Sequence, residues 1–521
     1  MKYIQFLFIF FNSSSALYAN SDISCLSHYV GRNQLIYHIK NLPFSSDSRV
    51  IKKQAFEVSE SMKVSDWVMT ELRKKSFDFL NENSKKEIID LDFLCLGAGP
   101  QCAAASLVLG HSKFSSLVVE RSDYVAKTFA EKDFYINSSE LDQLSMHQFP
   151  GGLGDLADYT SFEFAHSQQL ATHIQVQQLI SKVPVLFNTE VVEIKKVEDR
   201  EAIKFLFKTK NGLRFRVKNI LVGSGLGDIA TKVSDPNYRD FFSSQYELHI
   251  KQPKQLQLVM TTDTFLVTKK LMDCESRVMT LPRRIAVIGD GDGSKIVLES
   301  LLTKSVVLHP ETEIIWVGNE YKDFSDFYRS TKGFTRYLQG IFPFYEKRMI
   351  TGVKGYIQSW KKNSDGSFSM TAEDVVTKKV SDFTSDMIID STGYVSFVPT
   401  LKQWIGASQT LKDEVGELNE LDLKSTVLAR RMVDSVTSKE LNVYLLGASA
   451  GNLASRAELM NSPNKNPVSI FNTVPRTSSF LSYLTQTSKF PSYRGKKSSR
   501  QKVISSYEMI ERIKLKLAEV N

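Results

Sequence analysis

The fold is decided by residues 91–121, LDFLCLGAGPQCAAASLVLGHSKFSSLVVER, which predict a strand, a glycine turn, a helix and a second strand. Phe93–Leu96 is a short apolar run, as in strands that are buried on both faces of a parallel sheet. Gly97 and Gly99 permit a tight turn in which the backbone can approach a pyrophosphate. Free N–H groups at the start of the next helix would bind its negative charge. The stretch therefore predicts a dinucleotide-binding turn.

The residues after this turn support the same prediction. Pro100 suits the first position of a helix, and the alanines that follow keep that helix slim against the sheet. Glu120 ends the second strand 23 residues after Gly97, close to the spacing of about 20 expected for an acid that binds a ribose hydroxyl. A chance glycine pair in a loop would lack these neighbours. We predict that the first cofactor contacts Gly97, Gly99, Pro100, Cys102 and Glu120.

Residues 282–294, PRRIAVIGDGDGS, repeat the pattern and predict a second dinucleotide fold. A strand over 285–288 leads to a glycine turn and to a helix over 294–302, and we predict cofactor contacts at Gly289, Gly291 and Ser294. The next strand, 313–317, has no acid at its end to bind a ribose. Arg283, Arg284 and Lys295 could meet a 2′-phosphate, which favours NADPH over NADH, although solvated surface is the alternative for basic residues.

Two later apolar strands complete the predicted architecture. They are DMIIDSTGYV, residues 386–395, and NVYLLGASAGN, residues 442–452, whose turn contains Gly447; strands of this type return the chain to the first sheet. The predicted fold class is α/β, with two Rossmann-like dinucleotide-binding domains, the second inserted into the first. The predicted segments are an N-terminal extension (20–90), the first part of the first domain (91–280), the second domain (281–395), the second part of the first domain (396–490) and a basic tail (491–521).

Composition and charge exclude several other classes of protein. With 521 residues, 42% of them hydrophobic and 24% charged, the chain is long enough for several globular domains. The net charge of +8 is spread along the chain rather than gathered in one block, apart from short clusters such as Arg494–Lys497. This balance suits anionic cofactors, and no nucleic-acid-binding motif accompanies it.

The four cysteines show neither CxxC spacing nor a cysteine–histidine metal pattern, so we expect no metal site. Cys95 lies in the predicted strand and Cys102 at the start of the helix. We interpret both as core and packing residues rather than a redox pair.

The segments outside the two glycine turns predict further helices and loops, and two candidate site residues. Residues 20–90 predict one or two amphipathic helices, and residues 501–519 predict a last helix. Residues 134–164 are rich in turn formers and predict long loops, where function usually lies. His147 and Gln148 in these loops could reach the cofactor or substrate, with a surface or structural role as the alternative.

The two glycine turns, about 190 residues apart, and the strand ending Thr392-Gly393-Tyr394 resemble flavoproteins with two dinucleotide-binding domains. The chain is similar to flavin-dependent monooxygenases, particularly the branch that N-hydroxylates lysine or ornithine, whose central motifs are echoed by Gln148, Leu153-Gly154-Asp155-Leu156 and Thr160-Ser161-Phe162. The resemblance implies bound FAD, with Gln148 near it, and NAD(P)H as reductant. The sequence departs from the family at Gly154, where lysine is usual, and at Ala448, where related reductases carry aspartate.

The resemblance implies an oxidoreductase that forms a flavin hydroperoxide and oxygenates a small-molecule substrate. The sequence contains no serine–histidine–aspartate arrangement, and we assign no catalytic residue. Two alternatives stay open: a flavin reductase that passes electrons to a partner, and a nucleotide-binding protein that has lost turnover. The departures at Cys102 and Ala448 motivate the second alternative.

The first 19 residues, MKYIQFLFIFFNSSSALYA, are similar to a secretory signal peptide. One lysine precedes a Phe-rich apolar stretch that is too short for a membrane span, and small residues lead to Ala19. We expect an exported, periplasmic protein if this signal is real and a cytoplasmic one otherwise. A folded flavoprotein would be expected to use a twin-arginine signal, which the segment lacks.

Overall fold

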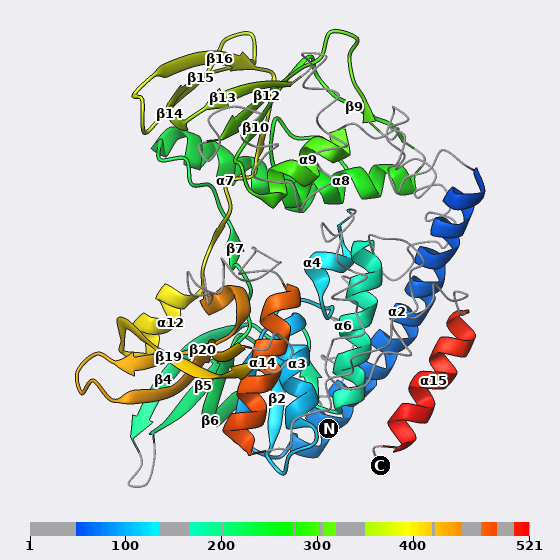
Figure 1. Ribbon diagram of the computed structural model, residues 1–521, viewed down its shortest axis with the longest axis vertical. Coiled ribbons are helices and arrows are strands. Elements are labelled where there is room, and N and C mark those ends of the chain that lie inside the picture. Colours follow the sequence, from blue (N-terminus) through cyan, green and yellow to red (C-terminus); the bar gives the residue numbers. More distant parts are fainter. Residues whose placement is uncertain are drawn as a thin grey trace, which may run out of the picture.

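The computed structural model describes residues 48–132, 134, 166–198, 203–275, 277–301, 306–318, 350–418, 423–450, 470–486 and 505–519. Within these ranges the chain forms two lobes, each built on a parallel sheet (Figure 1). The predicted signal segment, the loop residues 135–165 with His147 and Gln148, and most of the basic tail lie outside the described residues.

The first lobe contains five parallel strands in the order β3, β2, β1, β6, β21. Their bounds are β1 (Ile89–Leu96), β2 (Ser116–Val119), β3 (Val185–Leu186), β6 (Arg214–Val222) and β21 (Glu440–Leu445). Beyond β21 the sheet continues with antiparallel β20 (Leu423–Asp434) and β19 (Ala407–Leu418). The first half of β6 pairs with antiparallel β5 (Ile203–Thr209), which pairs with β4 (Val191–Glu198).

Both faces of this sheet are covered, as the apolar strand sequences require. One face packs against α3 (Pro100–Leu109), α6 (Ser167–Ser181) and α14 (Ile470–Thr485), and the other against α12 (Val398–Ile405) and the β4–β5 hairpin (Figure 1). Leu94 and Cys95, adjacent in β1, belong to opposite faces, because side chains alternate along a strand.

The N-terminal extension forms a single helix, α2 (Ser48–Asn83), where one or two helices were predicted. It packs on α6 and on α15 (Ser506–Glu519), as Figure 1 shows. Val68 and Leu72 belong to the core, and Ser65 Oγ donates a hydrogen bond of 2.6 Å to Gln175 Oε1. The helix is therefore an integral part of the first lobe.

The second lobe contains parallel strands in the order β13, β12, β10, β17, β8. Their bounds are β8 (Val259–Thr261), β10 (Arg284–Ile288), β12 (Glu313–Gly318), β13 (Ile350–Lys354) and β17 (Met387–Asp390). Helices α8 (Thr262–Cys274) and α9 (Asp292–Leu301) cover one face. The other face is covered by α7 (Pro236–Lys251) and by an antiparallel sheet of β14 (Tyr356–Lys362), β15 (Phe368–Glu373) and β16 (Val380–Ser385). A separate pair of short strands is formed by β9 (Met279–Thr280) and β11 (Val306–Val307).

Two short strands lie where the chain passes between the lobes. β7 (Asp228–Ile229) leads out of the first lobe, and β18 (Tyr394–Val395) leads back; they pair antiparallel (Figure 1). The first sheet is thus formed by strands within 89–222 and 407–445, and the second by strands within 259–390.

Two details of the predicted organisation are wrong. Residue 280 is too late as a boundary, because β8 already pairs with β17 in the second sheet; three residues are too few to show periodicity. The strand predicted over 386–395 was expected to return the chain to the first sheet, but β17 pairs with β10, and β21 makes the return.

Candidate functional site

The first glycine turn lies between β1 and α3, as predicted. Gly97 has φ +94°, and a Cβ on it would lie 3.1 Å from the Gly223 carbonyl oxygen, so the position requires glycine. Gly99 precedes α3, whose first residue is Pro100. A Cβ on Gly99 would lie 3.8 Å from the Gly223 carbonyl oxygen, an ordinary van der Waals distance, so no described residue crowds this side of the turn.

Glu120 lies directly after β2 and joins this turn. Its Oε2 accepts a hydrogen bond of 2.7 Å from the Ala98 N–H, and its Oε1 accepts one of 2.8 Å from the Ser122 N–H. Each carboxylate oxygen has two lone pairs, so both oxygens can still accept bonds from ribose hydroxyls. The predicted ribose acid therefore lies where that role requires.

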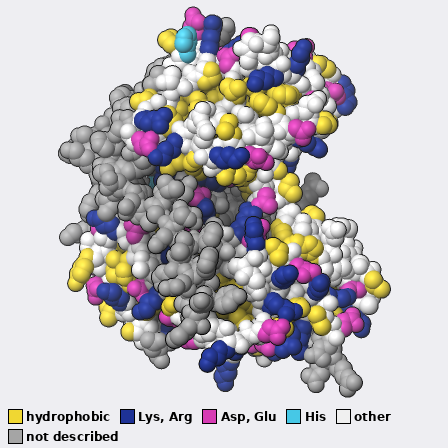
Figure 2. Space-filling model, turned by 180° about the vertical axis from the view of Figure 1, so that it is seen from behind, with side chains coloured by type: hydrophobic (Ala, Val, Ile, Leu, Met, Phe, Trp, Pro, Cys, Tyr) yellow, Lys and Arg dark blue, Asp and Glu magenta, His cyan; other side chains and the backbone are white. Residues whose placement is uncertain are grey.

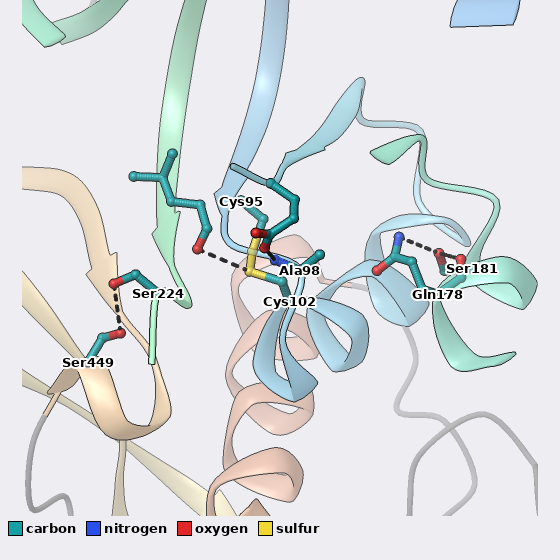
Figure 3. The surroundings of a disulfide bond; sticks show 9 residues. Cys95, Ala98, Cys102, Gln178, Ser181, Ser224 and Ser449 are labelled. Carbon is teal, nitrogen blue, oxygen red and sulfur yellow. Dashed lines mark hydrogen bonds between the residues drawn. A yellow bond between two sulfur atoms is a disulfide. The ribbon is translucent and has the colours of Figure 1, made fainter. Parts of the chain in front are cut away.

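Two more strands end at the same edge of the sheet. β6 leads into Gly223 and Ser224, and β21 leads into the 3₁₀ turn η4 (Gly447–Ala450). Ser224 Oγ and Ser449 Oγ lie 3.3 Å apart (Figure 3). A Cβ on Gly447 would collide with the Gln101 side chain in the first turn of α3. The structure thus brings together all the predicted contacts of the first site except Gln148, which lies outside the described residues.

The two cysteines beside this turn form a disulfide, which the sequence interpretation did not foresee. Cys95 near the end of β1 is bonded to Cys102 in the first turn of α3, with the Cα atoms 6.0 Å apart (Figure 3). Both are core residues, as predicted, with exposed fractions of 2% and 0%. They are nevertheless a bonded pair, because the helix returns across the strand and brings its first turn over Cys95.

The second glycine turn follows β10 and precedes α9. Gly289 has φ +119°, and a Cβ on it would lie 2.6 Å from the Ser391 carbonyl oxygen, whereas a Cβ on Gly291 would meet nothing within 4 Å. Ser294 is fully buried, and its hydroxyl donates to the Gly291 carbonyl oxygen at 2.7 Å. Open space therefore lies beside Gly291, and Ser294 supports the shape of the turn.

The basic residues expected to meet a 2′-phosphate are not placed to do so. Arg284 is the first residue of β10 and forms an ion pair of 2.5 Å with Asp386, and Arg283 pairs with Glu311 at 3.1 Å. Four strand residues, 285–288, separate Arg284 from Gly289, so their Cα atoms lie about 16 Å apart. The two arginines therefore lie at the opposite end of the strand from the turn, and Lys295 in α9 is only 5% exposed.

A buried acid that sequence reasoning missed lies at the end of β17. Asp390 Oδ2 accepts hydrogen bonds from Thr231 Oγ1 (2.6 Å) and the Tyr238 hydroxyl (2.9 Å), and its Oδ1 accepts one from the Thr392 N–H (2.9 Å). Burial raises the pKa of Asp390, and burial together with this carboxylate raises the pKa of Tyr238 well above 10. The sequence contained one sign of this site, an acid at the end of the apolar run 387–390. A carboxyl group buried in such a strand needs hydrogen-bond partners nearby.

An ion pair and a tyrosine hydroxyl connect the two lobes. Lys132, which follows the short helix α4 (Lys127–Ala130) in the first lobe, lies 2.5 Å from Asp263 in α8, and the Tyr394 hydroxyl donates to the same carboxylate at 3.0 Å. Lys132 and Asp263 are 8% and 13% exposed. Burial and the Asp263 carboxylate raise the pKa of Tyr394. Such pairing between distant segments has no local sequence signal.

On the face in Figure 2, Lys and Arg side chains are scattered over both lobes with acidic side chains among them. Within the described ranges, no three histidine, cysteine or acidic side chains gather as a metal site would require, and no helix has the length and apolar character of a membrane span.

No family model and no curated protein match this chain. Solved structures that resemble it include L-lysine 6-monooxygenase from Pseudomonas syringae (16% identity, 76% of this chain and 99% of that chain, TM-score 0.49). The bacillithiol disulfide reductase from Staphylococcus aureus (12%, 77% and 100%, 0.48) and the ornithine hydroxylase from Pseudomonas aeruginosa (13%, 76% and 99%, 0.47) are also similar. The N-hydroxylating group that the sequence resembles is thus among the similar structures, together with disulfide reductases.

Proposed function

We propose that the first lobe binds FAD at the turn between β1 and α3. One observation supports this most directly: Gly97, Gly99 and Glu120 lie together at the carboxyl ends of parallel strands, and no described residue crowds Gly99. In this arrangement the N–H groups at the start of α3 would bind the pyrophosphate and Glu120 the ribose. The residues present therefore fit the cofactor.

The second lobe, which we regard as an insertion into the first, would bind NAD(P)H at the turn of Gly289 and Gly291. Open space beside Gly291 supports this, since a pyrophosphate needs backbone without a side chain there. Two such sites in one chain suit hydride transfer from a nicotinamide to a flavin. The flavin would supply the redox chemistry, and the protein would bind, orient and shield the two cofactors.

Among flavin chemistries we favour a monooxygenase-like oxidation of a small molecule. A disulfide reductase needs a cysteine pair that can exchange with a substrate, and the pair that the structure describes, Cys95–Cys102, is buried under the phosphate turn. The pyrophosphate rather than the flavin ring contacts such a turn. We therefore expect little reduction of disulfide substrates.

Two other functions are separated from this one by direct measurement. A reductase that passes electrons to a partner would oxidise NAD(P)H without oxygen when an artificial acceptor is added, but would oxygenate nothing. A nucleotide-binding protein without turnover is suggested by Cys102 and Ala448, which replace family residues. The absorption spectrum of purified protein, followed by NAD(P)H oxidation with and without oxygen, distinguishes the three.

Two glycine variants test the assignment of the sites. Gly99→Val should abolish FAD binding, because its branched side chain would fill the space left for the pyrophosphate. Gly291→Val should leave the flavin content unchanged and raise the KM for NAD(P)H strongly. Flavin content is read from absorbance, and circular dichroism controls for folding. A folded Gly99→Val protein with full flavin content would refute the first site, and loss of flavin in Gly291→Val would mean that the sites are reversed.

We also propose export of the protein, in line with its signal-like first 19 residues. Disulfides form and persist mainly in oxidising compartments, and the Cys95–Cys102 bond supports such a location. Fractionation of cells that express the full chain, with mass measurement of the mature N-terminus, tests this proposal.

A further inference from the structure

We propose that the Cys95–Cys102 disulfide holds the first glycine turn in the shape that receives a pyrophosphate, so that FAD binding depends on the oxidation state of this pair. The inference rests on the proposed FAD site and names a device that regulates it. The two cysteines are positioning residues, since neither sulfur would touch the cofactor.

The bond encloses the turn. Cys95 is the second-last residue of β1 and Cys102 the third residue of α3, so the residues between them, 96–101, include the whole glycine turn (Figure 3). Two of those residues are glycines, whose backbone has the greatest conformational freedom. A covalent link that closes this segment removes part of that freedom.

The sulfur atoms also fill the space under the turn. A Cβ on Gly223 would lie 2.5 Å from Cys102 Sγ, and the same sulfur lies 3.7 Å from the Leu96 carbonyl oxygen. Because a disulfide sulfur carries no hydrogen, the second approach is a packing contact. The Gly223 carbonyl oxygen in turn borders Gly97 and Gly99. The disulfide therefore contacts both backbone segments that frame the phosphate site.

Reduction would disturb this packing. The third position of the glycine fingerprint is normally glycine or alanine, because the helix must pass close to the strand. Cys102 fits there while its sulfur is bonded to Cys95, but two separate thiols need more room than two bonded sulfurs. Both side chains are buried, so the extra room must come from movement of the first turn of α3 and its N–H groups.

Reduction of the Cys95–Cys102 disulfide transfers two electrons and two protons. A dithiol reductant that reaches the buried Cys95–Cys102 bond during local opening of the turn would break it, and each cysteine sulfur would gain one electron and one proton. The reductant would lose the two electrons and two protons and close its own disulfide. Oxidation of the pair by a disulfide oxidant reverses these changes.

Cysteine variants test the proposal without exposing other cysteines to reductant. We expect Cys95→Ala/Cys102→Ala to bind FAD at least about tenfold more weakly than wild type, measured by quenching of FAD fluorescence at 25 °C. Hydrogen exchange without FAD should be faster in a peptide that covers residues 96–102 and unchanged in one that covers α9. The matched control is Val118→Ala, a buried residue in register with Cys95 on β2. It should lower the melting temperature and leave the FAD affinity within about twofold.

A further variant changes the size of the third fingerprint residue while the disulfide stays absent. Cys95→Ala/Cys102→Gly places glycine, the other usual residue, at that position, and we expect it to bind FAD as weakly as the double alanine variant. Wild-type affinity in either double variant, or an equal loss in Val118→Ala, would overturn the inference and leave the FAD site intact. If oxidised wild type fails to bind FAD, the proposed function itself is wrong, and the inference falls with it.

Discussion

At the scale of single residues, Asp290 is the side chain with the clearest consequence for cofactor choice. A Cβ on Gly318, the last residue of β12, would lie 2.7 Å from Asp290 Cβ and 3.4 Å from its Oδ2. Asp290 therefore lies at the end of the strand where the fingerprint places its ribose acid, although it comes from the glycine turn. A carboxylate there accepts bonds from ribose hydroxyls and repels a 2′-phosphate.

We accordingly expect the enzyme to prefer NADH, against the preference suggested by the sequence. Asp290→Asn should lower the ratio of kcat/KM for NADH to that for NADPH by about tenfold, since a shift of about 1.4 kcal/mol is tenfold in rate. Arg283→Gln, at the far end of β10, is the control and should leave the ratio unchanged. The opposite result, with the ratio set by Arg283, would restore the sequence-based interpretation.

Residue positions were predictable where the determinants are local. Gly97, Gly99 and Glu120 lie within one strand–turn–helix–strand unit, so their spacing alone places them together. The Cys95–Cys102 bond and the place of Asp290 depend on how closely a helix or strand end packs on its neighbour. Spacing along the chain does not show that distance.

At the scale of elements, α7 and α8 meet through a buried histidine. His249 in α7 is 7% exposed, and its Nδ1 lies 3.4 Å from Thr268 Oγ1 in α8. Burial lowers the pKa of His249 from 6.5 to about 4. The folded protein therefore keeps this ring neutral at a pH where the unfolded chain would already be protonated.

This difference makes stability depend on pH. Between the two pKa values the unfolded chain binds more protons, so the free energy of unfolding should fall as the pH is lowered from 7 towards 4, by about 3 kcal/mol at most. His249→Gln should show a shallower fall over that range, measured by urea unfolding followed by circular dichroism. His309→Gln, at an exposed position, should keep the wild-type slope. If the free energy of unfolding falls equally with pH in the wild type and both variants, His249 is not the source of the pH dependence.

The parallel core strands were predictable, whereas the antiparallel sheet and the short edge strand of the second lobe were not. Apolar runs such as 285–288 and 93–96 have a strong pattern, because such strands are buried on both faces. The antiparallel sheet β14–β16 alternates exposed and buried positions, which is a weaker signal, and β8 is only three residues long. Its place at the sheet edge depends on pairing with β17, far along the chain.

At the scale of the whole molecule, Lys132 and Asp263 join the lobes by a largely buried ion pair. Removing one partner should disturb the placement of the two cofactor sites, because the remaining charge stays buried without its partner. Lys132→Met should therefore slow reduction of bound flavin by NAD(P)H several-fold, followed by stopped-flow absorbance, and leave the FAD affinity unchanged.

The double variant Lys132→Met/Asp263→Asn should recover part of the rate, which is the mark of coupling between the two residues. Lys210→Met removes an exposed lysine from a surface ion pair with Glu190 and serves as the control, with no expected effect on either measurement. Loss of FAD affinity in Lys132→Met would show that the residue supports the first site rather than the contact between lobes. These contacts could not be predicted, since they join segments about 130 residues apart.

The paired crossings β7 and β18 have a mechanical consequence. Tyr394 pairs with Ile229 and Val395 with Asp228, and the Ala230 N–H donates to the Gly393 carbonyl oxygen at 3.3 Å. Only two residues of each strand pair, so the connection between the lobes is narrow. A narrow connection of this kind is where a hinge between two domains is expected. We therefore expect any motion that brings a nicotinamide towards a flavin to be taken up at this pair of strands, with each lobe moving as a unit.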